Sequence, residues 1–289
     1  MKLGEIYSKI QTNPIISFEI FPPQNDENGE KTTKLFEEVK HLKTHTPALI
    51  SVTYGAGGSN KDTSFAIVKT LANDKNINVM PHFTCVCSSK NYIQNSIKEL
   101  NEMNIKNILA LRGDEPQDCL TCHLDFRYAN ELVSYLKETT DFSIGVAGYP
   151  EGHIDAPNIT EDIKNLKKKL NAGGEAIFTQ MFFDNSKLYN YLELLEKQNL
   201  TKPVIAGILP IISYNQLDKM LSLAKVTVPK TLMTKLEKYQ DKKEDIKKIG
   251  IDFASEQCQE LIDNGIKNLH FFTLNKSYSV CSILDNLGL

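Results

Sequence analysis

The sequence predicts an α/β fold of the (β/α)8 class, a closed TIM barrel made by one domain over residues 1–289. Apolar, β-branched runs typical of buried strands occur eight times, and a segment with helical periodicity follows each of them. A chain of 289 residues is also long enough for one such barrel. A doubly wound open sheet is the alternative, but no Gly-x-Gly-x-x-Gly motif follows the first strand.

Most of the predicted strands are apolar on both faces, as expected for strands covered by helices outside and by a core inside. In chain order they are Ile15–Phe21, Ala48–Tyr54, Ile77–Cys85, Ile105–Leu111, Phe142–Gly148, Glu175–Met181, Pro203–Leu209 and Lys267–Thr273.

The predicted helices carry apolar residues at spacings of three and four, so that each has one face for the sheet. The helix that begins at Thr160 also has acidic residues in its first turn, which suits the positive end of the helix dipole. A charged, mostly helical stretch, Val226–Asp252, is predicted as an extra segment between the seventh and eighth strands, with a break at Pro229. The other helices are Lys31–Lys43, Asn60–Leu71, Lys90–Met103, Tyr128–Lys137, Thr160–Ala172, Asn185–Lys197, Tyr214–Leu223 and Ser277–Leu287.

The composition argues against several classes of function. A net charge of −3 gives no basic footprint for nucleic acid. No apolar run is long enough to span a bilayer, and the amino terminus lacks the apolar core of a secretory signal. We therefore expect a cytoplasmic protein whose partners are small molecules rather than nucleic acid or membranes.

One cysteine motif needs an interpretation of its own. Cys119, Cys122 and His123 form a Cys-x-x-Cys-His pattern, which also occurs where haem is attached covalently. Haem attachment needs export, and a zinc site would need two more ligands, which Cys85 and Cys87 could supply if the fold brought them near. Without an export signal we expect reduced thiols and no metal, with a zinc site or a redox pair as the alternative.

Polar residues of unlike kinds gather at the carboxyl ends of the predicted strands, where barrel active sites lie. They are Glu19, Thr53, Tyr54, His82, Thr84, Arg112, Asp114, Tyr149, His153, Thr179, Gln180, Thr273 and Asn275. They show neither zinc-ligand spacing nor a nucleophile elbow. A carboxylate, an Arg-Gly-Asp turn, amides and hydroxyls in one place suit a large, planar, polar ligand. The residues by themselves predict an α/β barrel with a polar mouth, and no more.

The same strand ends carry a resemblance to a known family. From about residue 15 to residue 287 the chain resembles the methylenetetrahydrofolate reductases, flavoenzymes of one-carbon metabolism that make methyltetrahydrofolate for methionine synthesis. The matching motifs follow one another in order: Phe18–Pro23, Ser51–Ala56, Pro81–Cys85, Leu111–Asp114, Tyr149–His153, Thr179–Asp184, Gly207–Pro210 and Phe272–Asn275. The resemblance implies a barrel with non-covalent FAD. NADH or NADPH reduces the flavin and leaves, and the methylene folate then takes a hydride at the same face.

The resemblance also implies roles for three residues. Glu19 matches the general acid that protonates N10 of the folate, so we expect partial burial to raise its pKa towards neutrality. Asp114 matches a residue near the flavin pyrimidine edge, where a negative charge lowers the flavin potential. Gln180 would hold the pterin ring through its amide, which donates and accepts at once.

Further residues fall at FAD-contact positions of the family. Asp162, Asn165 and Lys169 share one face of a predicted helix, and that face could meet the ribose, adenine or pyrophosphate. Lys168 and Lys169 also belong to a run of lysines typical of a solvated face, and that interpretation stays open. The full set is Thr53, His82, Arg112, Gly113, Asp114, Tyr128, Ala129, Tyr149, His153, Asp162, Asn165, Lys168 and Lys169.

Three positions depart from the family pattern. Lys276 stands where an arginine can contact the folate, Tyr214 where a phenylalanine can stack on it, and Lys168 also replaces an arginine. Lysine keeps the charge but lacks the two-pronged geometry of a guanidinium, so folate affinity can differ.

Two other functions are alternatives. One is a different flavin barrel, such as a proline-dehydrogenase-like enzyme, and the motif Phe18–Pro23 argues against it. The other is a non-catalytic folate- or flavin-binding subunit of a larger redox complex, and the presence of Glu19 argues against that. The sequence does not decide between NADH and NADPH, and a homo-oligomer is implied by the resemblance alone.

Overall fold

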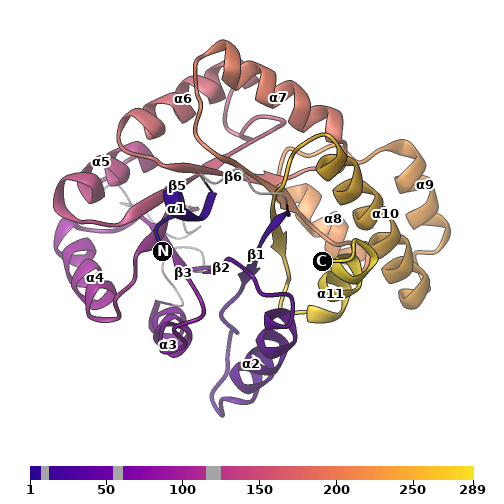
Figure 1. Ribbon diagram of the computed structural model, residues 1–289, viewed down its shortest axis with the longest axis horizontal. Helices are drawn as coiled ribbons and strands as arrows, with labels where there is room; N and C mark the ends of the chain where they lie inside the picture. The colour runs from indigo at the N-terminus through magenta and orange to yellow at the C-terminus, as the bar shows by residue number, and fades with distance from the viewer. Residues whose placement is uncertain (8–12, 55–60, 115–124) are drawn as a thin grey trace.

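Eight parallel strands close into a barrel, paired in chain order from β1 to β8 and back to β1. The computed structural model describes residues 1–7, 13–54, 61–114 and 125–289. Helices surround the strands on the outside (Figure 1). The predicted TIM barrel is thereby confirmed, and the open doubly wound sheet is excluded.

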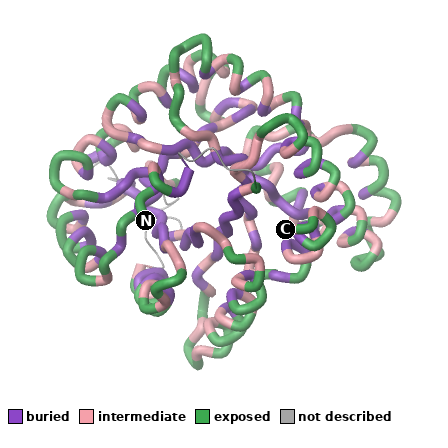
Figure 2. Tube along the Cα trace, viewed as in Figure 1, coloured by how far each residue is buried: buried purple, intermediate pink, exposed green. Residues whose placement is uncertain are grey.

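Each strand lies inside the run that the sequence predicts for it. The strands are β1 (Ile15–Ile20), β2 (Leu49–Val52), β3 (Val79–Thr84), β4 (Asn107–Leu111), β5 (Ser143–Gly148), β6 (Ala176–Met181), β7 (Val204–Ile208) and β8 (Asn268–Phe272). Nearly all of their residues are buried, because helices cover one face and the barrel interior covers the other, and Figure 2 shows this burial at the centre of the molecule.

The helices follow the expected order. They are α2 (Glu30–Lys43), α3 (Lys61–Ala72), α4 (Lys90–Glu102), α5 (Ala129–Thr139), α6 (Ile159–Asn171), α7 (Asn185–Lys197), α8 (Tyr214–Leu223) and α11 (Ser277–Asn286). Side chains cap several of them: at the start of α6, for example, the side-chain Oδ1 of Asn158 accepts a hydrogen bond from the backbone N–H of Glu161 at 3.0 Å.

The extra segment between β7 and β8 differs from the prediction. It contains α9 (Lys230–Lys238) and α10 (Lys243–Asp263), so its last helix runs well past the predicted end at Asp252. The added turns place Ala254, Cys258 and Leu261 in the main core. As a result α10, rather than α8, packs between α7 and α11 in the outer ring (Figure 1).

A short helix that the sequence analysis does not predict, α1 (Leu3–Tyr7), closes the amino-terminal end of the barrel. The backbone N–H of Leu3 donates to Ser143 Oγ at 3.1 Å, at the start of β5. Leu3, Ile6 and Tyr7 join a buried cluster with side chains of the barrel interior such as Met80 and Phe178. This end is therefore packed with apolar side chains.

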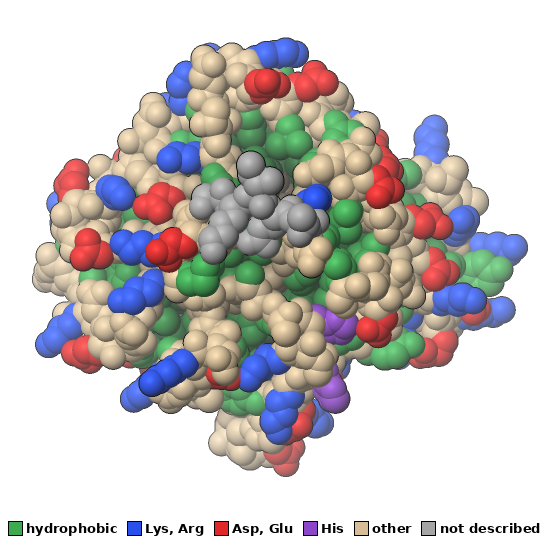
Figure 3. Space-filling model, in the orientation of Figure 1, with side chains coloured by type: hydrophobic (Ala, Val, Ile, Leu, Met, Phe, Trp, Pro, Cys, Tyr) green, Lys and Arg blue, Asp and Glu red, His purple; other side chains and the backbone are tan. Residues whose placement is uncertain are grey.

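No helix in the described part of the chain has the length and apolarity that crossing a membrane requires. On the face in Figure 3, basic and acidic side chains are interspersed, and neither sign forms a continuous patch.

Candidate functional site

The carboxyl group of Glu19 lies inside the barrel near the carboxyl end of β1, with 6% of the residue exposed. Its Oε2 is 3.2 Å from Nε2 of His82 on β3 and 3.8 Å from Nε2 of His270 on β8. The Thr273 hydroxyl donates to the backbone oxygen of Glu19 at 2.7 Å and holds this part of β1 against the end of β8. The charged partners of Glu19 in the described structure are therefore two imidazoles.

The expectation of a raised pKa at Glu19 is wrong. Burial alone would raise this pKa, but the nearby His82 and His270 outweigh it and lower the pKa to about 2. The carboxyl group is therefore ionised in the folded protein at neutral pH, and another group must hold any proton that it passes on.

Because the folded pKa of Glu19 lies below its ordinary value of 4.5, the unfolded chain takes up this proton first as the pH falls. The stability that Glu19 contributes is complete above about pH 4.5 and is lost on the way to pH 2. We expect the difference in unfolding free energy between wild type and Glu19→Gln to shrink by about 1 kcal/mol from pH 6 to pH 3.5. Urea titrations of both proteins measure it, and a difference that stays constant with pH would contradict the ion pairing.

Sequence reasoning missed His270, together with Ser17 and Ser51 as its partners. His270 is 1% exposed; its Nδ1 lies 2.8 Å from Ser17 Oγ and its Nε2 lies 3.4 Å from Ser51 Oγ. Two signals were available in the sequence. Ser17 stands two residues before Glu19 and so shares its face of β1, and His270 interrupts an otherwise apolar strand.

The turn after β4 carries Arg112, Gly113 and Asp114. Gly113 has a φ of +87°, a left-handed conformation that favours glycine, and a Cβ there would lie 2.8 Å from Val86 Cγ1. This turn directs Arg112 towards the loop after β5, where its guanidinium lies 3.7 Å from Asp155 Oδ2. Asp114 is exposed and follows β4, so it lies at the same end of the barrel as Glu19.

A second cluster forms between the loop after β5 and α6. The ring of Tyr149 packs edge-on against His153 at 4.7 Å, and Lys169 Nζ lies 5.6 Å from the Tyr149 ring. Lys169 also donates to the carbonyl of Ala147 at 2.6 Å. His153 Nδ1 lies 3.8 Å from Asp155 Oδ2, so Asp155 links this cluster to Arg112.

Burial shifts the titration of this second cluster. It raises the pKa of Asp162 despite the opposing charge of Lys169, and it lowers the pKa of Lys169 to about 8. Burial also raises the pKa of Tyr149, and the charges of Asp162 and Asp114 add to the effect. These residues from β4, β5 and α6 therefore act on one another.

The remaining residues that the resemblance places at the FAD and folate sites lie after strand ends or on the helices that follow. Gln180 Oε1 accepts the backbone N–H of Met181 at 2.9 Å, and the exposed Lys168 donates to Asn165 Oδ1 at 3.1 Å. The exposed Lys276 lies beside Glu38: burial raises the pKa of that carboxyl, but the Ser277 hydrogen bonds and then the charge of Lys276 outweigh burial and lower it. The others are Thr53 after β2, Tyr128 and Ala129 at the start of α5, and Tyr214 at the start of α8.

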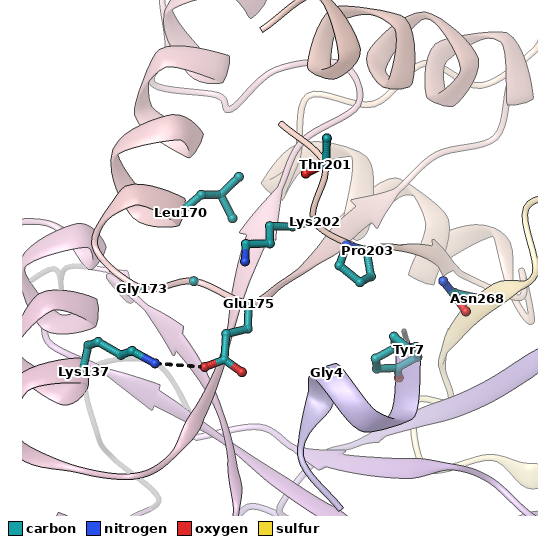
Figure 4. A pocket seen from close by; sticks show the side chains of 11 residues that line it. Gly4, Tyr7, Lys137, Leu170, Gly173, Glu175, Thr201, Lys202, Pro203 and Asn268 are labelled. Carbon is teal, nitrogen blue, oxygen red and sulfur yellow. Dashed lines mark hydrogen bonds and ion pairs between the residues drawn. The ribbon is translucent and has the colours of Figure 1, made fainter. Parts of the chain in front are cut away.

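A hollow of about 820 Å³ lies at the opposite end of the barrel. Figure 4 shows Lys137 paired with Glu175 at 3.3 Å and Lys202 reaching into the same space. Tyr7 and Gly4 of α1 also line it. None of the predicted site residues does, so this hollow is separate from the strand-end site.

The described residues contain no group of three His, Cys, Asp or Glu side chains arranged to hold a metal ion. Cys85, Cys258 and Cys281 are free thiols. Cys87 is disulfide-bonded, so the expectation of reduced thiols throughout is wrong at this position. Cys119, Cys122 and His123 lie outside the described residues.

Comparisons with known proteins agree with the strand-end motifs. The family model described as methylenetetrahydrofolate reductase matches residues 3–288. The 5,10-methylenetetrahydrofolate reductase of Buchnera aphidicola subsp. Schizaphis graminum is 37% identical over 288 residues, covering 100% of this chain and 95% of the relative. A protein of Oryza sativa subsp. japonica, described as a probable methylenetetrahydrofolate reductase (NADH), is 34% identical, and the match covers 95% of this chain and 48% of the relative.

Among solved structures, an uncharacterised protein from Clostridium thermocellum that binds two copies of 5-methyl-5,6,7,8-tetrahydrofolic acid has the same fold. The TM-score is 0.62 at 16% identity, over 95% of this chain and 93% of that one.

Proposed function

Because the chain belongs to the methylenetetrahydrofolate reductase family, we propose that it reduces 5,10-methylenetetrahydrofolate to 5-methyltetrahydrofolate. The reductant is NADH or NADPH, and FAD carries the hydride in a ping-pong sequence. The observation that carries the proposal is the position of Glu19, a buried ionised carboxylate between two imidazoles at the active end of a TIM barrel. The resemblance adds a cytoplasmic homo-oligomer to the proposal.

The residues beside Tyr149 suit FAD by the chemistry of their donors. Arg112 and Lys169 would supply positive charge for a pyrophosphate, His153 a ring nitrogen, and Asp162 an acceptor for ribose hydroxyls. Asn165, exposed on the same helix, would add a second acceptor. Arg112 lies beside Asp155, so a bound pyrophosphate would replace that carboxylate as its partner. FAD, when bound, takes a hydride from the nicotinamide and gives it to the folate.

The carboxylate of Asp114 would act on the flavin through its charge. A negative charge at the pyrimidine edge disfavours an anionic reduced ring and so lowers its potential. The same charge would stabilise the cationic form of the folate. The exposure of Asp114 leaves its carboxylate accessible to a ligand at the mouth.

On the folate, the acid function falls to Glu19. Protonation of N10 makes this nitrogen a better leaving group, opens the five-membered ring and leaves an electrophilic iminium at N5. Gln180 would hold the pterin through its amide, and Tyr214 and Lys276 would contact the rest of the folate. Lys276 offers a point charge in place of the planar fork of arginine.

Anaerobic stopped-flow spectroscopy tests the proposed function. The purified protein should be yellow, should bleach when NADH or NADPH is added, and should recolour with methylene folate as methyl folate forms. Comparison of the two nicotinamides decides the reductant. A colourless protein would favour a non-catalytic folate-binding subunit, and a yellow protein that does not respond to folate would favour another flavin barrel.

We expect Lys169→Met to weaken FAD retention by about 10- to 100-fold, because the variant removes a half-buried positive charge next to Tyr149. The absorbance at the flavin maximum after dialysis at pH 7 measures it. Lys164→Met is the matched control, since Lys164 lies on the same helix but pairs with Glu161 at the surface. Equal retention by the two variants would show that Lys169 does not bind the cofactor.

A further inference from the structure

Five polar side chains lie inside the barrel where apolar packing would otherwise be expected. Glu19, His82 and His270 are 6%, 7% and 1% exposed, and Ser17 and Ser51 are fully buried. Buried polar and ionised groups destabilise a protein unless they are paired, so a cluster of this size calls for a chemical role.

The partners of the two ring nitrogens of His270 suggest an assignment of its hydrogens. The Ser17 hydroxyl donates its hydrogen to the carbonyl of Leu269 at 3.3 Å, so its oxygen is free to accept. With the hydroxyl directed at Leu269, we assign Nδ1 of His270 as the donor to Ser17 Oγ at 2.8 Å, which places a hydrogen on Nδ1 in both charge states of the ring. Only Nε2 is left to gain or lose a proton, and Nε2 points at Glu19 and at Ser51.

The surroundings of His270 contain few other ionisable groups. The rings of Phe178 on β6 and Phe272 on β8 pack edge-on against the imidazole at 5.3 Å and 5.7 Å. On the other elements, the facing titratable groups are Glu19 on β1, His82 on β3 and, beyond Phe178, Tyr7 on α1. A proton on Nε2 is therefore exchanged within the barrel with Glu19.

We propose that His270 stores the proton that Glu19 delivers to the folate. The inference rests on the proposed function and deepens it. The stored proton would rest on Nε2 of His270, which lies 3.8 Å from the Glu19 carboxylate, a gap that a shift of about 1 Å turns into a hydrogen bond. His82 lies nearer to Glu19 but its Nε2 makes no hydrogen bond, and no described residue fixes its ring as Ser17 fixes that of His270.

The proton transfer balances as follows. The Nε2–H bond of His270 breaks as a new O–H bond forms on Glu19, and the Glu19 proton passes to N10 as the bond from N10 to the methylene carbon breaks. The bonding electrons of that carbon–nitrogen bond stay on N10. His270 is left neutral with its hydrogen on Nδ1, and Ser51 can then donate to the vacant Nε2. A proton from solvent restores the imidazolium before the next turnover.

The test combines nuclear magnetic resonance with half-reaction kinetics on the FAD-loaded protein. Nitrogen-15 spectra of imidazole-labelled wild type should show His270 protonated at both nitrogens at pH 7. The same ring should lose its Nε2 proton at a lower pH in Glu19→Gln, because the facing negative charge is gone. A neutral His270 ring in wild type at pH 7 would overturn the proposal.

His270→Gln should slow reduction of methylene folate by about 100-fold and abolish the fall of that rate as pH rises through the imidazole titration. Flavin reduction by the nicotinamide should stay unchanged. His45→Gln is the matched control, because His45 likewise has one ring nitrogen hydrogen-bonded, at 2.9 Å to a carbonyl oxygen, and the other 3.8 Å from a carboxylate, but it precedes β2 at the opposite end of the barrel. Loss of both half-reactions together, or an unaltered pH profile, would overturn the proton-storing role.

Failure of this inference is distinguishable from failure of the proposed function. If wild type does not reduce methylene folate at all, the proposed function fails. If wild type does so and His270→Gln keeps its rate and pH profile, only the role of His270 fails. Should His270→Gln not fold, the wild-type resonance titration decides by itself.

Discussion

Glu19→Gln is expected to lower the rate of methylene folate reduction by about 1000-fold while flavin reduction by the nicotinamide continues at close to the wild-type rate. The amide keeps the size of the side chain but can neither release a proton to N10 nor take one from His270. Hydride transfer from the nicotinamide to the flavin needs no proton from this residue, so the two half-reactions should separate. Single-turnover absorbance traces of each half-reaction measure the effect.

The control for this variant is Glu175→Gln. Glu175 is also a partly buried carboxylate, bonded to Ser143 and to Lys137, but it lies at the opposite end of the barrel. It should leave both half-reactions unchanged. If Glu19→Gln slowed the two half-reactions equally, Glu19 would be a structural residue of β1 and the assignment of the acid would fail.

Gly250→Ala is expected to destabilise the protein by about 3 kcal/mol or more, the second large effect. Gly250 lies within α10, where the absence of a side chain lets the helix touch the backbone after β7. A Cβ at this position would overlap the carbonyl oxygen of Ile211 and lie 3.1 Å from its Cα. Neither partner can give way cheaply, because both are backbone, so α10 must move off its seat between α7 and α11.

Gly4→Ala is the control for Gly250→Ala within the same protein. Gly4 is also helical and a Cβ there meets nothing within 4 Å, so this variant should be neutral or slightly more stable, since alanine favours a helix by up to about 1 kcal/mol. Denaturant midpoints of the two variants measure the contrast. A Gly250→Ala protein as stable as wild type would mean that α10 does not press on Ile211.

The sequence predicts the barrel well because each local segment shows a clear strand or helix pattern, and the two patterns alternate along the chain. Every strand lies inside its predicted run, since continuous apolar runs bounded by turn residues leave little choice of structure. Two elements escaped for different reasons. The helix α1 has five residues, too few to show a helical period, and it forms because the barrel end needs apolar cover. The second half of α10 has the polar composition of an exposed segment, and its burial becomes clear only from its contacts with α7 and α11.

At the candidate site the sequence identifies residues but not their pairing. Glu19 and His82 stand at strand ends where polar side chains attract notice, and the structure brings them within 3.2 Å. His270 was missed because it stands in the middle of its strand, where a lone polar residue is most simply a packed core residue. The direction of the pKa shift of Glu19 was wrong because the prediction considered burial but not the two imidazoles across the barrel. Distances across a closed sheet depend on register, which no local pattern contains.

Helix α1 closes the amino-terminal end of the barrel and leaves the opposite end open. Tyr7 packs edge-on against Phe178 at 5.9 Å, and Phe178 packs on His270, so two aromatic layers separate the imidazole from water beneath the barrel. Among the described residues, these rings lie between the cluster and the amino-terminal end of the barrel, so we expect solvent to reach the cluster from the side on which substrate enters. A folate bound over Glu19 would then block exchange with solvent, so that each turnover would use the one proton already stored in the cluster.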